Sequence, residues 1–177
     1  MAGGQEVFTE RLLLRPFALD DRAQIVTFYG NAEVMAIRKL GVLDASAAER
    51  QLQIILDHWR AHGFGIWAVM ERASGCFAGE CGLRWADDGA DVELTYGLLP
   101  AFRGRGYATE AARAALAFGF DTLSLHRIVA MARGDNAASH HVLEKCGMTR
   151  VWLRASGDHG LVRYAVQRSS GHRRQGI

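Results

Sequence analysis

The sequence predicts a single α/β (α+β) domain with a mixed, mostly antiparallel central sheet flanked by helices. Three observations support this prediction. Three consecutive strand-like segments are joined by short turns, strands alternate with helices only in the second half of the chain, and 177 residues suit one domain. This order differs from the strict alternation of a dinucleotide-binding fold. We take residues 7–168 as the domain and expect 169–177 to be a disordered tail.

The expected strands are apolar or alternating segments that end at turn residues. They span residues 8–17, 65–72, 76–85, 91–99, 126–132, 148–154 and 161–167. The turns 73–75 and 87–89 connect the three central strands, which predicts an antiparallel meander.

Four helices are expected between these strands. Asp20 and Asp21 are candidate caps for the first, which ends near residue 31. Ser46 and Glu49 form the pattern of a capping box, which predicts that the second helix runs over residues 46–62. The other two are expected over residues 106–120 and 136–146.

The composition is that of an ordinary globular protein, with 49% hydrophobic and 23% charged residues. A net charge of +2 gives no reason to expect a nucleic-acid partner. Three cysteines, Cys76, Cys81 and Cys146, fit a reducing compartment better than a disulfide scaffold. Because no apolar run approaches the ~20 residues of a membrane span, we expect a cytoplasmic protein without a membrane partner.

Residues 98–110 are the most informative segment, because a strand ends there, a glycine-rich turn follows and a helix begins. The first turn of a helix leaves its N–H groups without internal partners, and its dipole favours negative charge. Gly104 and Gly106 allow the backbone to approach a ligand closely. The segment therefore predicts a site for a pyrophosphate.

Three phosphate-binding patterns compete for this segment. The P-loop pattern needs a Gly-Lys pair, which the chain lacks. The dinucleotide fingerprint needs glycine at the position of Thr109 and a βαβ context. The third pattern, [RQ]xxGx[GA], is matched in full by Arg103, Gly106 and Ala108.

That third pattern resembles the coenzyme A loop of the GNAT superfamily of N-acetyltransferases, and the resemblance covers nearly the whole chain. The segments similar to the ribosomal-protein alanine N-acetyltransferase branch are residues 9–12, 15–17, 20–21, 79–83, 106–111, 136–139 and 144–148. The resemblance implies an acyl-CoA N-acyltransferase fold with a sheet splayed at the cofactor, and acetyl-CoA as co-substrate. A homodimer is common in that branch.

The resemblance also implies which residues bind the cofactor. The edge formed by residues 96–99 is expected to pair with the pantetheine arm, and the Leu98 N–H is the candidate donor to the thioester oxygen. Gly97 fits a bulge or a close backbone approach. The expected cofactor-binding residues are Tyr96, Leu98, Leu99, Arg103, Gly104, Arg105, Gly106, Tyr107, Ala108, Thr109, Asn136 and Ser139.

Ser139 is the expected proton donor, or hydrogen-bond partner, of the leaving thiolate. In the resembled branch the Asn136-x-x-Ser139 element reaches the pantetheine arm, with the serine near the sulfur. Many superfamily members use a tyrosine seven residues after the asparagine, and here that position is Leu143. The simpler interpretation is that Asn136 only caps the helix.

Glu93 and Glu80 are the candidate bases that remove a proton from the amine. Both lie on central strands, where a lone carboxylate is costly to bury unless it is paired or hydrated. Glu93 is the first choice because its strand leads to the thioester edge. A solvent-facing carboxylate remains the alternative for either.

The sequence therefore predicts an enzyme that moves acetyl from acetyl-CoA to a protein N-terminus or a small amine by direct attack in a ternary complex. Residues 32–41 and 155–160 are expected to form the acceptor rim. His58 and His62 have a metal-compatible spacing but no third ligand, so we predict no metal. A non-catalytic acyl-CoA-binding module and a ribosome- or RNA-associated protein are the alternatives.

Overall fold

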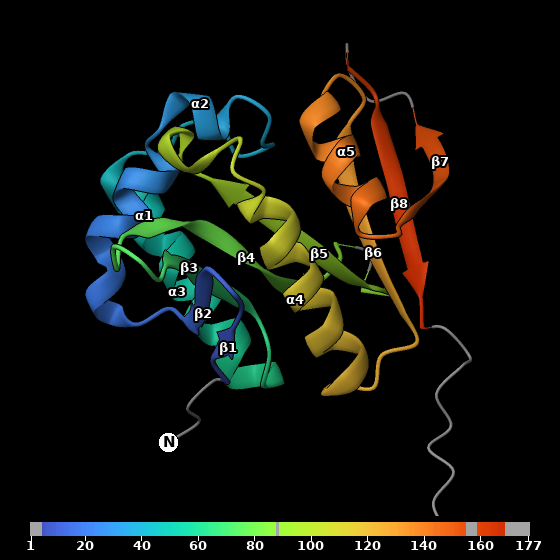
Figure 1. The fold of residues 1–177 in the computed structure, drawn as a ribbon. Helices are drawn as coiled ribbons and strands as arrows, with labels where there is room; N and C mark the ends of the chain where they lie inside the picture. The colour runs from blue at the N-terminus through green and yellow to red at the C-terminus, as the bar shows by residue number, and fades with distance from the viewer. Residues whose placement is uncertain (1–4, 88, 155–158, 169–177) are drawn as a thin grey trace, which may run out of the picture.

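The computed structural model describes residues 5–87, 89–154 and 159–168 (Figure 1). Its strands are β1 (Val7–Phe8), β2 (Leu12–Pro16), β3 (Ile66–Glu71), β4 (Phe77–Trp85), β5 (Val92–Leu98), β6 (Arg127–Arg133), β7 (Thr149–Arg154) and β8 (Leu161–Gln167). Its helices are η1 (Leu19–Asp21), α1 (Arg22–Tyr29), α2 (Ala32–Met35), α3 (Ala45–His62), η2 (Pro100–Phe102), α4 (Tyr107–Asp121) and α5 (Ala137–Lys145). In this part of the chain no helix is both long and apolar enough to span a bilayer.

The strands form one sheet in the order β1-β2-β3-β4-β5-β6-β8-β7. Neighbouring strands are antiparallel except for β5 and β6, which α4 connects as a crossover. The predicted fold class, a mixed and mostly antiparallel sheet flanked by helices, is confirmed. The predicted tail 169–177 lies outside the described residues.

Helices cover both faces of the sheet. Helix α4 crosses in front of β4 and β5, while α1 and α3 lie behind them (Figure 1). The face of α4 that meets the sheet carries small residues, and a Cβ built on Gly119 would lie 2.6 Å from Ile128 Cδ1. Such close packing explains the alanine-rich pattern of this helix.

The predicted strand 8–17 is wrong in one respect, because it is a hairpin of β1 and β2. Thr9 causes the reversal. Its N–H donates to the Leu12 carbonyl at 2.9 Å, and its Oγ1 accepts from the Leu12 N–H at 2.9 Å. These local bonds replace ladder bonds, as threonine side chains often do at turns.

Two helix caps also differ from the prediction. Helix α3 begins at Ala45 because Asp44, not Ser46, accepts from a first-turn N–H, that of Ala47, at 2.7 Å. Asp21 precedes α1, but its carboxylate binds Arg15 and the Ala18 N–H instead of capping the helix.

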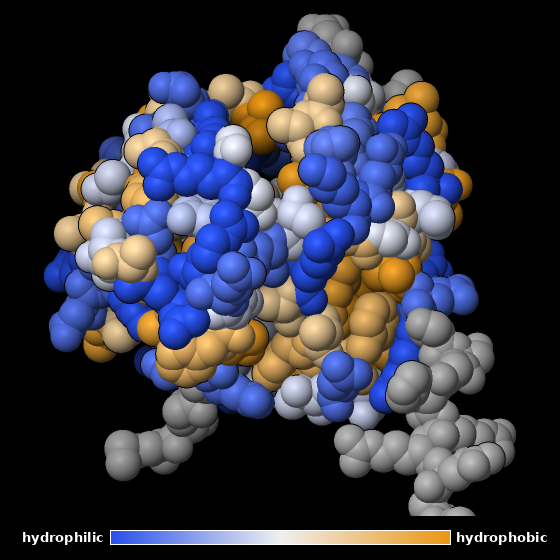
Figure 2. Space-filling model, viewed as in Figure 1, coloured by the Kyte–Doolittle hydropathy of each residue, from blue (hydrophilic) through white to orange (hydrophobic). Residues whose placement is uncertain are grey.

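Strands β5 and β6 diverge, and this divergence positions the candidate site. They pair only through Val92, Glu93 and Leu94 of β5, so the last four residues of β5 have no partner in β6. The predicted splay of the sheet is thus confirmed. Figure 2 shows the surface hollowed in this region, between α2 and α5.

Candidate active site

The glycine-rich turn lies at the open end of β5, directly before α4. Gly104 and Gly106 have φ angles of 74° and 81°, and Gly106 is the N-cap residue of α4. Within the described residues, no main-chain acceptor pairs with the N–H groups of residues 104–109. A turn of this kind gathers free N–H groups at a helix N-terminus, which suits a phosphate.

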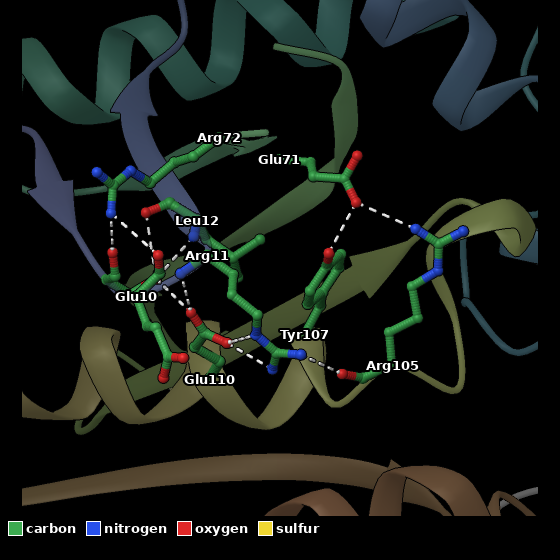
Figure 3. Close-up of polar contacts among 9 residues, drawn as sticks. Glu10, Arg11, Leu12, Glu71, Arg72, Arg105, Tyr107 and Glu110 are labelled. Atoms are coloured by element: carbon green, nitrogen blue, oxygen red, sulfur yellow. Dashed lines mark hydrogen bonds and ion pairs between the residues drawn. The ribbon is translucent and has the colours of Figure 1, made fainter. Parts of the chain in front are cut away.

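Arg11 holds this turn in place from β1–β2. Its Nη1 donates to the Arg105 carbonyl at 2.8 Å, and its Nε donates to Glu110 at 2.7 Å (Figure 3). Glu110 also accepts from Thr9 Oγ1 at 2.6 Å. Burial alone would raise the pKa of Glu110, but these hydrogen bonds keep it below its ordinary value. No local sequence pattern indicates this role of Arg11.

The charged and aromatic side chains of the turn are bound to other groups of the protein. Arg105 pairs with Glu71 at 3.1 Å, and the Tyr107 hydroxyl donates to the same carboxylate at 2.7 Å (Figure 3). Arg103 Nε donates to the Leu98 carbonyl at 3.1 Å. These predicted cofactor-binding residues therefore offer a ligand their main-chain groups rather than their side chains in this arrangement.

The end of β5 presents its backbone to the opening. The Leu99 N–H donates to the Ala78 carbonyl of β4 at 2.9 Å. Because hydrogen-bonded and non-bonded positions alternate in an antiparallel pair, the N–H groups of Tyr96 and Leu98 point away from β4. They face the gap where β6 has departed.

Across this gap, α5 brings Ser139 to Tyr96. The Tyr96 hydroxyl lies 2.8 Å from Ser139 Oγ. Asn136 accepts from the Ser139 N–H at 3.1 Å, so it is the N-cap residue of α5. Burial strongly raises the pKa of Tyr96, which keeps its hydroxyl protonated. Leu143 is buried elsewhere on the helix.

Glu80 lies on the opposite face of the sheet in a closed polar cluster. It is 1% exposed; Arg38 Nη1 donates to one carboxylate oxygen at 2.6 Å and the Tyr29 hydroxyl to the other at 2.9 Å. Burial opposes the charge of Arg38, but Glu80 keeps the pKa of Arg38 above its ordinary value. Arg38 lies within the predicted rim 32–41, but no sequence pattern distinguishes it from its neighbours.

Glu93 lies far from the open end of β5 and is paired with a cation. It pairs with Arg84 at 2.8 Å. Four residues of β5 separate it from Leu98, and five steps of about 3.3 Å put the two residues roughly 16 Å apart. Burial raises the pKa of Glu93, and the nearby Arg84 opposes that rise. Glu80, in contrast, lies opposite Gly97 in the ladder.

The histidine pair does not resemble a metal site. His58 Nδ1 lies 2.8 Å from the Phe64 carbonyl, and its Nε2 accepts from the Trp85 N–H. Within residues 5–87, 89–154 and 159–168, no group of three or more His, Cys, Asp or Glu side chains is placed to hold a metal ion. Of the predicted acceptor rim, residues 155–158 lie outside the described residues.

Comparison with known proteins gives the family. Residues 11–149 match the family model described as Acetyltransferase (GNAT) domain. The chain therefore belongs to the GNAT acetyltransferase family and is an acetyl-CoA-dependent N-acetyltransferase. The uncharacterized N-acetyltransferase YnaD of Bacillus subtilis is 28% identical over 144 residues, which cover 81% of this chain and 82% of YnaD.

Two solved structures share the fold but differ in acceptor. RimL, a ribosomal L7/L12 alpha-N-protein acetyltransferase in complex with coenzyme A, has a TM-score of 0.81 and 15% identity, covering 92% of this chain and 98% of RimL. The spermidine N-acetyltransferase of Vibrio cholerae, in complex with CoA and spermine, has a TM-score of 0.76 and 18% identity, covering 90% and 96%. The predicted superfamily is confirmed, whereas the fold alone does not identify the acceptor.

The raised pKa of Glu93 predicts a pH-dependent stability. A carboxyl with a raised pKa favours the folded state when protonated, and that stability is lost as pH rises through the folded pKa. We expect Glu93→Gln to gain stability relative to the wild type as pH increases from about 4 to about 7. Thermal unfolding of both proteins across this range measures the difference.

Arg84→Ala provides the matched variant, because it removes the cation that lowers the pKa of Glu93. Its loss of stability on raising the pH should be steeper than that of the wild type. A difference between Glu93→Gln and wild type that does not change with pH would contradict this account.

Proposed function

We propose that the enzyme transfers acetyl from acetyl-CoA to a primary amine by direct attack in a ternary complex at the open end of β5. The observation that carries the proposal is the meeting of two sets of main-chain donors at one place. The N–H groups of residues 104–109 lie at the start of α4, and those of Tyr96 and Leu98 face the neighbouring gap.

The first set fits the pyrophosphate of coenzyme A. A Cβ on Gly104 would meet nothing within 4 Å, so the space beside this turn is open to a ligand. The second set fits the amides of the pantetheine arm, which would pair with β5 as an added strand does. When bound, acetyl-CoA supplies the activated acetyl group, and the Leu98 N–H is the proposed donor to its thioester oxygen.

Ser139 is the proposed hydrogen-bond or proton donor to the leaving thiolate. It lies at the start of α5 beside the gap, and its Oγ contacts the Tyr96 hydroxyl at 2.8 Å. Burial raises the pKa of Tyr96, so its hydroxyl stays protonated and can donate a hydrogen bond to Ser139 Oγ. Tyr96 thereby contributes its side chain as well as its backbone.

Direct attack is supported by the state of the buried thiols. Burial raises the pKa of both Cys81 and Cys146. A thiol must ionise to act as a nucleophile, so neither is suited to carry an acetyl group covalently.

Coenzyme A binding and acetyl transfer test the proposal together. We expect acetyl-CoA to raise the melting temperature of the wild type, and a panel of amines to include at least one that is acetylated with release of free CoA. Binding of CoA without turnover would favour the non-catalytic module. Salt-dependent RNA affinity without CoA binding would favour the RNA-associated alternative.

Two matched glycine variants, one in the turn and one far from it, test where coenzyme A binds. Gly104→Ala and Gly63→Ala both force alanine into a positive φ, 74° and 72°, with nothing within 4 Å of the new Cβ. Each should cost about 1 kcal/mol of stability. Only Gly104→Ala should weaken CoA binding, by about tenfold or more; equal affinities of the two variants would contradict the proposed site.

Replacing Ser139 tests the proton donor. We expect Ser139→Ala to lower kcat by roughly 100-fold, with a smaller change in the KM for acetyl-CoA, because the donor acts on the leaving group. Tyr96→Phe should lower kcat less, since Ser139 remains. His141→Ala, on the exposed side of α5, is the control and should retain wild-type kcat. Wild-type kcat in Ser139→Ala would remove this residue from the mechanism.

A further inference from the structure

Arg38 has a buried nitrogen without a partner. Nη1 binds Glu80 at 2.6 Å, whereas no described residue accepts a hydrogen bond from Nη2. The guanidinium is held by Glu80 and by contacts with the Phe28 and Tyr29 rings, whose centroids lie 5.0 and 5.8 Å from Cζ. A buried guanidinium donor left unpaired is costly, so it is suited to a ligand that supplies an acceptor atom.

The free nitrogen lies against β5 at the open end. A Cβ built on Gly97 would lie only 2.4 Å from Arg38 Nη2, so the guanidinium occupies the space that a side chain at this position would need. Gly97 is flanked by Tyr96 and Leu98, whose N–H groups face the gap. Nη2 is therefore beside the proposed thioester site, on the face opposite Ser139.

This position restricts the chemistry of the acceptor. A guanidinium N–H seeks a carbonyl or carboxylate oxygen. A polyamine offers no oxygen and would bring positive charge toward Arg38. An α-amino acyl group carries its oxygen close to the amine, which matches a donor beside the reacting atoms.

The placement of the carboxylates favours the same acceptors. Both oxygens of Glu80 are engaged, and Glu93 is roughly 16 Å along the strand from Leu98. Among the described residues, then, neither candidate base is both free and near. An α-amine, with a pKa near ~8, is partly neutral at physiological pH, whereas a lysine-type amine near ~10.4 is almost entirely charged.

We propose that Arg38 is a specificity-determining residue that selects acceptors in which a carbonyl or carboxylate oxygen adjoins the amine. Nη2 binds that oxygen, while Glu80 acts as the positioning residue that orients the guanidinium. The inference rests on the proposed function, since it concerns the acceptor of the same transfer. The oxygen belongs either to a free α-amino acid or to the first carbonyl of a peptide.

Four acceptors and three variants test this assignment. Alaninamide has a carbonyl, alanine a carboxylate, sec-butylamine neither, and spermidine is a polyamine. The measured quantity is kcat/KM per neutral amine, expressed as a ratio to sec-butylamine. Arg38→Lys keeps one charge for Glu80 but has no second nitrogen, and Gly97→Ala displaces Nη2. Arg60→Ala, which removes an exposed arginine of α3 away from the site, is the control.

We expect the wild type to prefer alaninamide or alanine over sec-butylamine by about tenfold or more, and spermidine to be the poorest acceptor. Arg38→Lys and Gly97→Ala should each lose most of that preference, and Arg60→Ala should keep it. Preference for alaninamide identifies a peptide-like acceptor, and preference for alanine a free amino acid; either supports the assignment.

Three results would overturn the proposal, and they do so in two distinguishable ways. If the wild type acetylates amines without preferring an oxygen, or if both variants keep the preference, Arg38 is not the selector, although the proposed function stands. If the wild type acetylates no amine at all, the proposed function fails and takes this inference with it. As a control, acetyl-CoA should raise the melting temperature of each variant, which shows that a variant that has lost the preference is still folded and still binds the cofactor.

Discussion

The parting of β5 from β6 is the constraint on which the rest of the structure depends. Three residue pairs join these parallel strands, after which β6 continues beside β8 and leaves the end of β5 open. Exposed main-chain groups at a sheet edge normally invite another strand. Here they face a hollow between α2 and α5 (Figure 2), so the partner they suit is a narrow amide-bearing ligand.

The open edge also separates two environments on the faces of the sheet. Tyr96 turns toward α5 and meets Ser139, whereas Gly97, one residue later, turns toward Arg38 and Glu80. Alternate residues of a strand face opposite sides of the sheet. A substitution on one face can therefore change the surroundings of Ser139 or of Arg38 without changing the other. The proposed proton donor lies on the first face, and the proposed selector of the acceptor lies on the second.

Local patterns allowed much of this site to be predicted from the sequence. The turn before α4 and the start of α5 are contiguous segments, and their glycines and caps carry the signal themselves. Arg11 could not be found in this way, because its partners Arg105 and Glu110 lie more than ninety residues away. The contact of Arg38 with Gly97 is equally non-local.

The incorrect predictions of the strand 8–17 and of the α3 cap also have their origin in side-chain contacts. Thr9 closes a turn within an apolar segment, and Asp44 caps α3 two residues before the predicted cap, Ser46. In both cases a short polar side chain competed with a regular pattern at close range. The engagement of Glu80 by Tyr29 and Arg38 depends on tertiary packing, which a strand pattern does not contain.

Amide hydrogen exchange, measured residue by residue with and without coenzyme A, tests the central claim most directly. The account predicts that the N–H groups of Leu98 and of residues 104–108 exchange more slowly when coenzyme A is added, because they become its hydrogen-bond donors. Protection confined to another surface, with Leu98 and the turn unchanged, would contradict it.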